Sequence, residues 1–404
     1  MIAVATASIL LLLTPVPPAA TTVGQDAAQA ATPIDAAALR RQTLEQALAV
    51  SELVPAEFHG RERAKLQEAA AIAMIDAGLL DEARRVVPRI AGWRSAALLA
   101  RVALEDAKAG RREQAKALAE RVVAASKGSA ITDWQREALA VAAGRVHAQL
   151  GEDAVAAELE KGVGENEMGK VAATRAEAFP LESFDAQMTL AEGWVKTLNF
   201  DLTRNAVDIA VAYYSSVFAD SARRARVESL VEAANRHLAL DLRVTAWLRL
   251  ADVAREKSDR AAASAFIAKA DALRAGSSWA PEDEAALLAQ LASAKARAGD
   301  EKAARADLEA AVAIYDAGRE RIIDIYRAKA LRAVAESYAG LGDAAAARGV
   351  YMRALDEGAV NPNARPRAAD LVATMLSMVS SGIEPDEAAS ARIASIREGL
   401  IDPW

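Results

Sequence analysis

The sequence predicts an all-α protein in which antiparallel helix pairs stack into a right-handed superhelical solenoid. About a quarter of the 404 residues are alanine, which loses no side-chain entropy in a helix and lets neighbouring helices approach closely. Runs of Val, Ile, Thr and aromatic residues, which favour strands, are missing. Turn residues recur at regular intervals along a chain too long for one compact core. These observations predict an elongated array of helical repeats.

The composition excludes several classes of function. The chain has no cysteine, so it cannot hold a disulfide, a Cys-ligated zinc or iron–sulfur site, or a cysteine nucleophile. Its net charge is -7 and its isoelectric point is near 5.4. A dedicated nucleic-acid binder needs a basic face, so we expect no nucleic-acid partner.

The first 30 residues are predicted to be a signal peptide or low-complexity leader. Ile2 to Leu13 form an apolar stretch that is shorter than the roughly 20 residues needed to cross a bilayer but fits the core of a secretory signal. Ala28 to Ala30 provide a small-x-small cleavage pattern, although no Lys or Arg precedes the apolar stretch. We therefore expect an exported chain, periplasmic or secreted, without stable membrane insertion. The alternative is a helical or disordered N-terminal tail.

From Asp35 onward the sequence indicates helices separated by short breaks, in three sections. Residues 35–165 are predicted to be N-terminal helical repeats, 166–240 divergent repeats and 241–400 C-terminal repeats. Within the divergent section, 184–198, 202–218 and 222–238 are predicted helices, and Asn199 to Asp201 are expected to form a turn. The whole array is expected to hold about seven or eight helix pairs.

The repeats are defined by equivalent turn positions with small residues at fixed distances. The turn positions are Gly78, Gly110, Gly151, Ser258, Gly299 and Gly342. Seven residues earlier stand Ala71, Ala103, Gly144, Ala251, Ala292 and Ala335, and five residues later stand Ala83, Ala115, Ala156, Ala263, Ala304 and Ala347. Two antiparallel helices joined by a tight turn pack closely only if small residues face each other at the crossing. Glu160 breaks the pattern, because the slot nine residues after the turn is apolar in the other repeats.

The segment Leu331 to Ala354 resembles the tetratricopeptide repeat (TPR) family, with a large apolar residue, a small residue, an aromatic residue, a Gly-Asp turn, Ala, an aromatic residue and Ala in the family's order. Trp247 to Ala251 is similar to the family's opening, and Leu288 to Ala311 matches with Leu in place of the aromatics. Good matches cover about half of the chain. The family's proline after the second helix is mostly absent, and the spacings between turns depart from the usual 34 residues.

The resemblance implies that the first helix of each pair lines a groove that holds an extended peptide or a helix of a partner. On that face would lie Lys329, Arg332 and Glu336, whose spacing of i, i+3 and i+7 places them on one side of one helix. In the Trp247 repeat the corresponding residues are Asp252 and Arg255. The alternative for these five residues is ordinary solvated helix surface.

We find no catalytic, cofactor or metal-binding motif. The three histidines, His59, His147 and His237, are far apart in the sequence, and none has a metal-ligand spacing. The stretch Gly162 to Gly169 is glycine-rich but follows a helix and lacks a phosphate-loop lysine, so we interpret it as a linker.

The favoured function is therefore a non-catalytic scaffold that binds a protein or peptide partner. One alternative is a self-associating structural protein of the cell envelope. The other is a sugar-active enzyme built as an α/α toroid, which would need aromatic platforms and paired acids on its loops.

Overall fold

The computed structural model describes residues 36–178 and 183–404, so the predicted leader at 1–30 lies outside the described residues. All secondary structure in these two ranges is helical. The α-helices are α1 (Ala36–Leu53), α2 (Ala56–Asp76), α3 (Leu80–Val86), α4 (Trp93–Lys108), α5 (Arg112–Ser126), α6 (Asp133–Gln149), α7 (Asp153–Glu160), α8 (Lys170–Ala178), α9 (Phe184–Lys196), α10 (Phe200–Val217), α11 (Ser221–Ala234), α12 (Leu240–Glu256), α13 (Arg260–Ala275), α14 (Pro281–Arg297), α15 (Glu301–Gly318), α16 (Asp324–Gly340), α17 (Ala344–Gly358), α18 (Ala364–Ser380) and α19 (Glu387–Glu398). Two 3-10 turns, η1 (Val87–Arg89) and η2 (Arg319–Arg321), follow α3 and α15.

The structure confirms all six predicted turns. Each turn residue joins two α-helices and has a positive φ, which glycine adopts without strain. In the turns after α14 and α16, an aspartate follows the glycine and accepts a hydrogen bond from a backbone N–H of the next helix, so it caps that helix. The Gly-Asp pair therefore ends one helix and starts its antiparallel neighbour.

The small residues on either side of these turns lie at the helix crossings, as predicted. All twelve positions are buried, and Ala335 and Ala347 have no exposed surface. At Gly144, an added Cβ would come within 3.2 Å of Val171 on α8. The crossings are therefore close because the residues there have little or no side chain.

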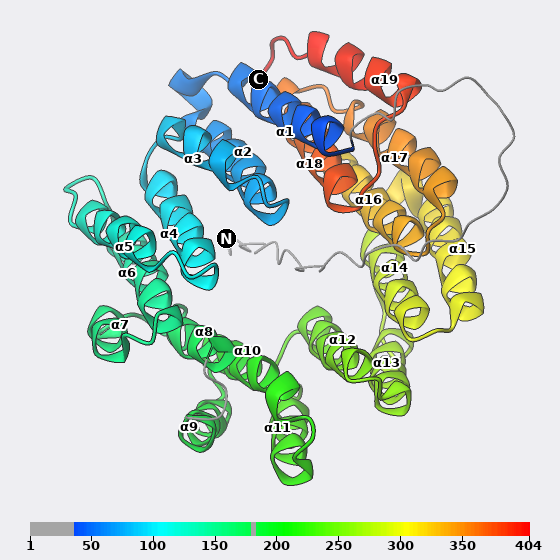
Figure 1. The fold of residues 1–404 in the computed structure, drawn as a ribbon. Helices are drawn as coiled ribbons and strands as arrows, with labels where there is room; N and C mark the ends of the chain where they lie inside the picture. The colour runs from blue at the N-terminus through cyan, green and yellow to red at the C-terminus, as the bar shows by residue number, and fades with distance from the viewer. Residues whose placement is uncertain (1–35, 179–182) are drawn as a thin grey trace, which may run out of the picture.

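The helices form two layers arranged around a common axis (Figure 1). The even-numbered helices lie on the inside and the odd-numbered helices on the outside. Each even-numbered helix from α2 to α16 packs against the next even-numbered helix, and α18 in turn packs against α2. The inner layer of the described chain is thus a closed cycle, a feature that the sequence pattern did not indicate.

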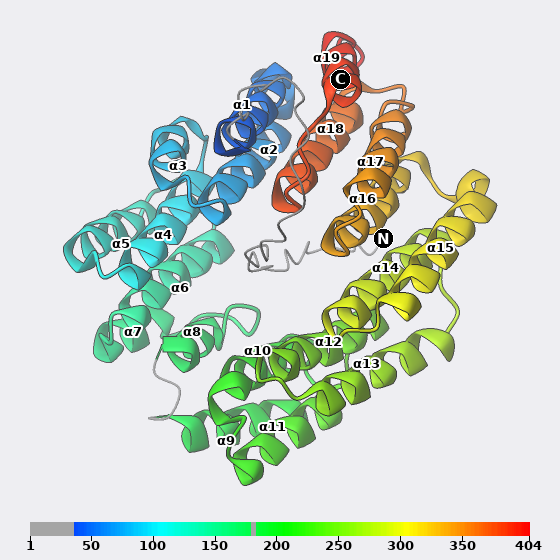
Figure 2. The ribbon, with the colours of Figure 1, turned by 45° about the vertical axis from the view of Figure 1, so that its right-hand side comes forward.

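The first described helix helps to close this cycle. α1 packs against both α2 and α18, and both ribbon views show the blue N-terminal helices beside the red C-terminal ones (Figures 1 and 2). Ala47 and Val50 of α1 share one buried apolar cluster with Leu371 and Met375 of α18. The two ends of the described chain therefore contribute to the same core.

The divergent section contains the three predicted helices, α9, α10 and α11. Leu198, between α9 and α10, has a φ of 59° and occupies the position that glycine or serine holds in the other turns. Ala191, seven residues earlier, and Thr203, five residues later, are both fully buried. The same turn and crossing are therefore present here, with Leu and Thr in place of the usual small residues.

Candidate functional site

Three of the five predicted groove residues lie on α16 in the inner layer. Lys329 and Glu336 are exposed, whereas the Arg332 side chain keeps only 13% of its surface exposed. Lys329 makes no hydrogen bond or ion pair with any residue of the two described ranges. The three residues therefore share a helix but differ in their surroundings.

Arg332 is engaged by the neighbouring inner helix, α18. Its Nη1 atom lies 3.0 Å from Oδ1 of Asp370 and 3.4 Å from Oγ1 of Thr374. Burial raises the pKa of the Asp370 carboxyl, and the positive charge of Arg332 opposes this effect. Arg332 thus links two helices of the inner layer.

Glu336 is also engaged by α18. Oγ of Ser377 donates a hydrogen bond of 2.6 Å to Oε1 of Glu336, and the Tyr351 hydroxyl lies 2.9 Å from the same Oγ. The surrounding protein displaces water and so raises the pKa of Glu336, while the Ser377 hydrogen bond and the charge of Arg332 lower it. The predicted face of α16 therefore borders a polar seam with α18.

The other two predicted residues lie on α12. Nε of Arg297, on α14, donates a hydrogen bond of 2.8 Å to Oδ1 of Asp252. Arg255 lies 3.3 Å from its neighbour Glu256. The structure therefore brings Asp252 into contact with the next inner helix but does not place Arg255 beside the α16 residues in any described contact.

The contacts of Arg332 and Asp252 belong to a recurring link between even-numbered helices. In each of four such links, an arginine of one inner helix donates a hydrogen bond of 2.6 to 3.0 Å to an aspartate of the neighbouring inner helix. Sequence reasoning missed them because the partners are 25 to 45 residues apart and no local spacing marks them. The four pairs are Arg101–Asp76, Arg249–Asp208, Arg297–Asp252 and Arg332–Asp370.

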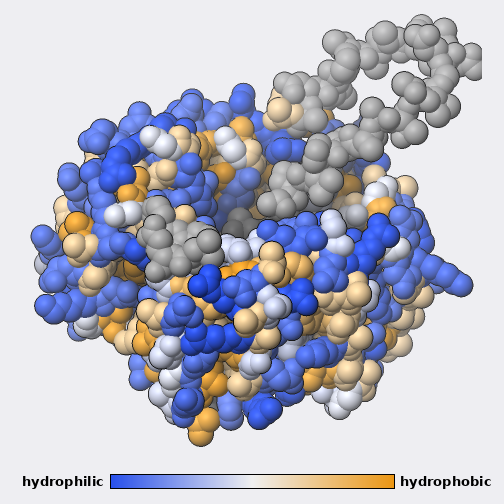
Figure 3. All heavy atoms as spheres, turned by 60° about the horizontal axis from the view of Figure 1, so that its bottom comes forward, coloured by the Kyte–Doolittle hydropathy of each residue, from blue (hydrophilic) through white to orange (hydrophobic). Residues whose placement is uncertain are grey.

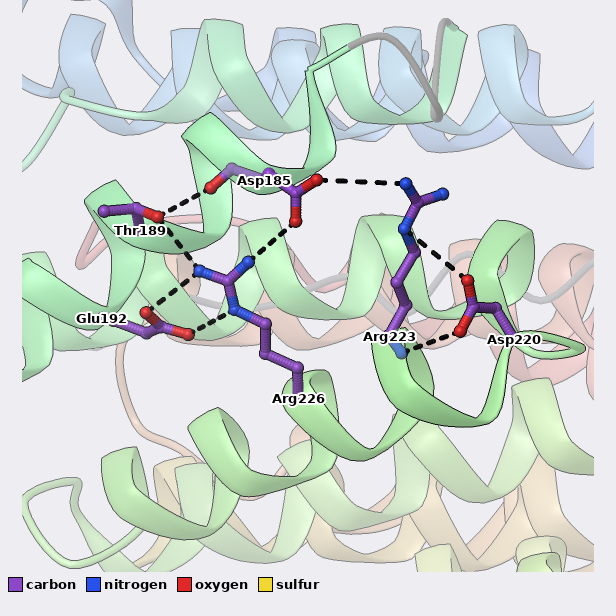
Figure 4. A network of polar contacts seen from close by, with 6 residues as sticks. All are labelled: Asp185, Thr189, Glu192, Asp220, Arg223 and Arg226. Atoms are coloured by element: carbon purple, nitrogen blue, oxygen red, sulfur yellow. Dashed lines mark hydrogen bonds and ion pairs between the residues drawn. The ribbon is translucent and has the colours of Figure 1, made fainter.

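A separate polar network joins the outer helices α9 and α11 (Figure 4). The Arg226 guanidinium on α11 donates to both carboxylate oxygens of Glu192, at 2.7 and 3.1 Å, and to Asp185 and Thr189 at 3.0 Å. Arg226 also lies over the ring of Phe184, with its Cζ 5.9 Å from the ring centre. Its donors are therefore used within the chain, and the network holds two outer helices together.

A pocket of about 340 Å³ opens where α7, α8 and α9 meet. Its apolar walls come from Met168, Ala172, Leu190 and Trp194. Glu160, Lys161 and Gln187 supply polar atoms. Glu160 is the residue that breaks the apolar slot of the repeat, so that irregularity in the sequence marked a position in this pocket.

No group of three or more His, Asp and Glu residues in the described ranges is arranged to hold a metal ion. The His147 ring is buried, and its Nδ1 lies 2.8 Å from Oε2 of Glu152. Among the helices described, none is both long and apolar enough to cross a bilayer. On the face in Figure 3, hydrophilic side chains cover most of the surface and apolar ones are scattered between them.

Comparisons with known proteins give no assignment. No protein-family model matches the chain, and no curated protein matches it.

Proposed function

We propose that the chain is an exported, non-catalytic scaffold whose helix pairs are TPR-like repeats and whose inner layer binds a peptide or helix of a partner protein. The observation that carries the proposal is a group of exposed side chains at the start of α16 and α18. Ile325, Tyr326 and Lys329 are exposed on α16, and Arg365 is exposed on α18. Exposed apolar area bordered by polar or charged side chains is typical of an interaction surface.

The register of α16 against α18 brings these residues to the same level. Nδ2 of Asn361 lies 2.9 Å from Oδ2 of Asp324, and Arg332 binds Asp370 further along. The two helices therefore run parallel with an offset of 37 to 38 residues, so that Arg365 lies within about one helical turn of Lys329. Neither cation has an ion-pair partner in the described part of the chain.

The charge of this region favours an acidic partner segment. In the stretch from Arg319 to Arg332, three arginines are paired with Glu357 or Asp370, which leaves Arg321 and Lys329 without an ion-pair partner among the described residues. Lysine and arginine supply charge-assisted donors to carboxylates, and the exposed Ile325 and Tyr326 supply apolar contact area. A short acidic peptide with an apolar residue would satisfy both requirements.

Selection from a random peptide library with the chain as bait tests the proposal, followed by affinity measurements on the selected peptides. The double substitution Lys329→Ala with Arg365→Ala is expected to weaken the binding of acidic peptides by about tenfold or more. Arg260→Ala with Lys302→Ala is the matched control, because it removes two exposed cations from the outer helices α13 and α15. An equal loss of peptide affinity in the control would show that the effect comes from the overall charge of the chain, and it would overturn the proposal.

The closed cycle of inner helices is the feature that favours the α/α-toroid enzyme as a second candidate. Such an enzyme needs two carboxyl groups about 5 to 9.5 Å apart that are free to face a sugar. The inner-layer carboxylates Asp208, Asp252 and Asp370 are each bound by an arginine of a neighbouring helix. Release of reducing sugar from polysaccharides by the purified chain would favour the enzyme over the scaffold.

A self-associating structural protein is the third candidate. It would oligomerise without a partner, whereas a scaffold of the proposed kind is expected to remain a monomer until its peptide is added. Sedimentation of the purified chain with and without the selected peptide separates these two functions.

A further inference from the structure

Two irregularities of the sequence meet in the pocket between α7, α8 and α9. The first is Glu160, in a slot that is apolar in the other repeats, and the second is the glycine-rich stretch 162–169. In the structure the backbone N–H of Gly169 donates a hydrogen bond of 2.9 Å to Oε1 of Glu160. The glycine-rich stretch therefore folds back and holds the unusual carboxylate in place at the pocket wall.

The local fold explains why the chain leaves a pocket here. α8 has nine residues and packs against α6 and α10, while α9 packs chiefly on α10. Gly169 has a φ of 86°, and an added Cβ would lie 2.7 Å from the Trp194 ring. The glycine thus lets the indole approach the backbone and form part of the wall, and a larger residue would not fit.

The pocket is lined by two side chains with hydrogen-bond acceptors, Glu160 and Gln187, and by one cation, Lys161. Oε1 of Gln187 is buried and has no hydrogen-bond partner within the residues that the structure describes. Glu160 contributes its second carboxylate oxygen, and burial raises the pKa of this carboxyl despite the Gly169 hydrogen bond. The Lys161 side chain is 75% exposed, and its Nζ lies 3.8 Å from Oε2 of Glu158, whose negative charge offsets that of the lysine. The site therefore favours a ligand that donates hydrogen bonds and carries positive charge.

We propose that this pocket binds an organic cation, an ammonium or guanidinium group on an aliphatic stem, with the cation at Glu160 and Gln187 and the stem against Leu190, Met168 and Trp194. The indole face adds a favourable cation–π contact for a group that enters beside it. The inference goes beyond the proposed function, because the pocket lies on the outer side of α8 and uses none of the α16 and α18 residues. The same chemistry is offered by a free alkylamine and by a lysine or arginine side chain of a peptide.

The test compares three probes of equal length: pentylamine, pentanol and pentanoate. Binding is followed by nuclear magnetic resonance at the indole N–H of Trp194, which is identified by its loss in Trp194→Phe. Pentylamine is expected to shift this signal with saturation and to bind at least fivefold more tightly than pentanol, while pentanoate leaves the signal unchanged. Equal binding of pentylamine and pentanol would overturn the inference.

Glu160→Gln tests the role of the charge, because the glutamine oxygen can still accept the hydrogen bond from Gly169. This variant is expected to weaken the binding of pentylamine by about tenfold and to leave the binding of pentanol unchanged. Glu120→Gln is the matched control, since it removes an exposed carboxylate of α5 that does not line the pocket. An equal effect of both variants would overturn the inference.

A second variant keeps the test independent of any effect of Glu160 on folding. Ala157 lines the pocket from α7 and is exposed, so Ala157→Phe is expected to fill the pocket and abolish the response of Trp194 to pentylamine. An unchanged response would show that the amine binds elsewhere. Titration with acetyl-Ala-Lys-Ala-amide then separates the two sources: tighter binding than pentylamine assigns the pocket to a peptide side chain, and weaker binding assigns it to a free amine.

Discussion

The Arg332 guanidinium of α16 and the Asp370 carboxylate of α18 form an ion pair of 3.0 Å in which 13% and 12% of the two side chains are exposed. The sequence pattern placed Arg332 in a partner-binding groove, but this residue already has a partner within the chain. Its removal would therefore affect the inner layer as well as any bound peptide. For this reason the binding test proposed above uses Lys329 and Arg365 instead.

Arg332→Ala is expected to destabilise the protein by about 2 to 4 kcal/mol, because it leaves the buried Asp370 carboxylate without its cation. Asp370→Ala alone should have an effect of similar size. The double variant should lose less than the sum of the two single variants, since the pair is then removed together. Urea unfolding of the four proteins measures this coupling, and strictly additive losses would show that the pair contributes nothing.

Ala335→Leu and Ala347→Leu should each destabilise by about 1 to 3 kcal/mol, because both alanines are fully buried where α16 and α17 cross. Ala345→Leu is the control on α17, where the side chain is exposed. Thermal unfolding gives the comparison. A midpoint for Ala335→Leu equal to that of the control would mean that the crossing can accept the extra volume.

The closure by α1 predicts coupling between the two ends of the described chain. Leu44 is fully buried in the cluster that includes Val379 of α18, so Leu44→Ala should cost about 2 to 5 kcal/mol. Hydrogen exchange should become faster in α1, α2 and α18, while α10 to α12 keep their protection, because each repeat contacts only its neighbours. Unchanged exchange in α18 would contradict the closure.

Glu152, the residue before α7, binds side chains of α5 and α6 through one carboxylate. Arg112 and Lys116 of α5 lie 2.7 and 2.6 Å from its Oε1, and His147 of α6 binds Oε2. Burial would raise the pKa of Glu152, but the hydrogen bonds from Lys116, His147 and Arg112 outweigh it and lower the pKa to about 2.

This lowered pKa sets the pH dependence of stability. Between the ordinary value of 4.5 and about 2, the unfolded chain binds more protons than the folded one. The contribution of Glu152 is therefore fully present above pH 4.5 and is lost as the pH falls toward 2. Glu152→Gln should lower the thermal midpoint at pH 7. The difference in midpoint between this variant and the wild type should become smaller at acid pH. A difference that stays constant from pH 7 to pH 3 would contradict the assignment.

The turns and crossings could be predicted from sequence because each depends on residues within about a dozen positions. Gly342 and Ala335 show this, since a positive φ and a buried small residue leave a local pattern. The links between even-numbered helices could not be predicted, because Arg297 and Asp252 are 45 residues apart and look like ordinary surface charges. The pocket left one signal, Glu160 in an apolar slot, whereas the buried oxygen of Gln187 left none.

The turn predicted at Asn199 to Asp201 lies slightly earlier in the structure, at Leu198, because α10 already begins at Phe200. Leucine is rarely found at positive φ, so the sequence did not mark Leu198 as the turn residue. A non-glycine residue in this conformation costs roughly 1 to 2 kcal/mol, and glycine removes that cost while adding freedom to the unfolded chain. The Leu198 side chain is 65% exposed, so little packing is lost on its removal. We therefore expect Leu198→Gly to stabilise the protein by about 0.5 to 1 kcal/mol.

The converse substitution, Gly342→Ala, isolates the same backbone effect. Its φ is 77°, and among the described residues no atom lies within 4 Å of an added Cβ, so any loss comes from the backbone conformation and not from a clash. It should destabilise by about 1 kcal/mol. The urea unfolding midpoints of the two variants should therefore shift in opposite directions from that of the wild type. If Leu198→Gly instead destabilises, the leucine side chain contributes more to packing than its exposure indicates, and the turn between α9 and α10 is not equivalent to the glycine turns.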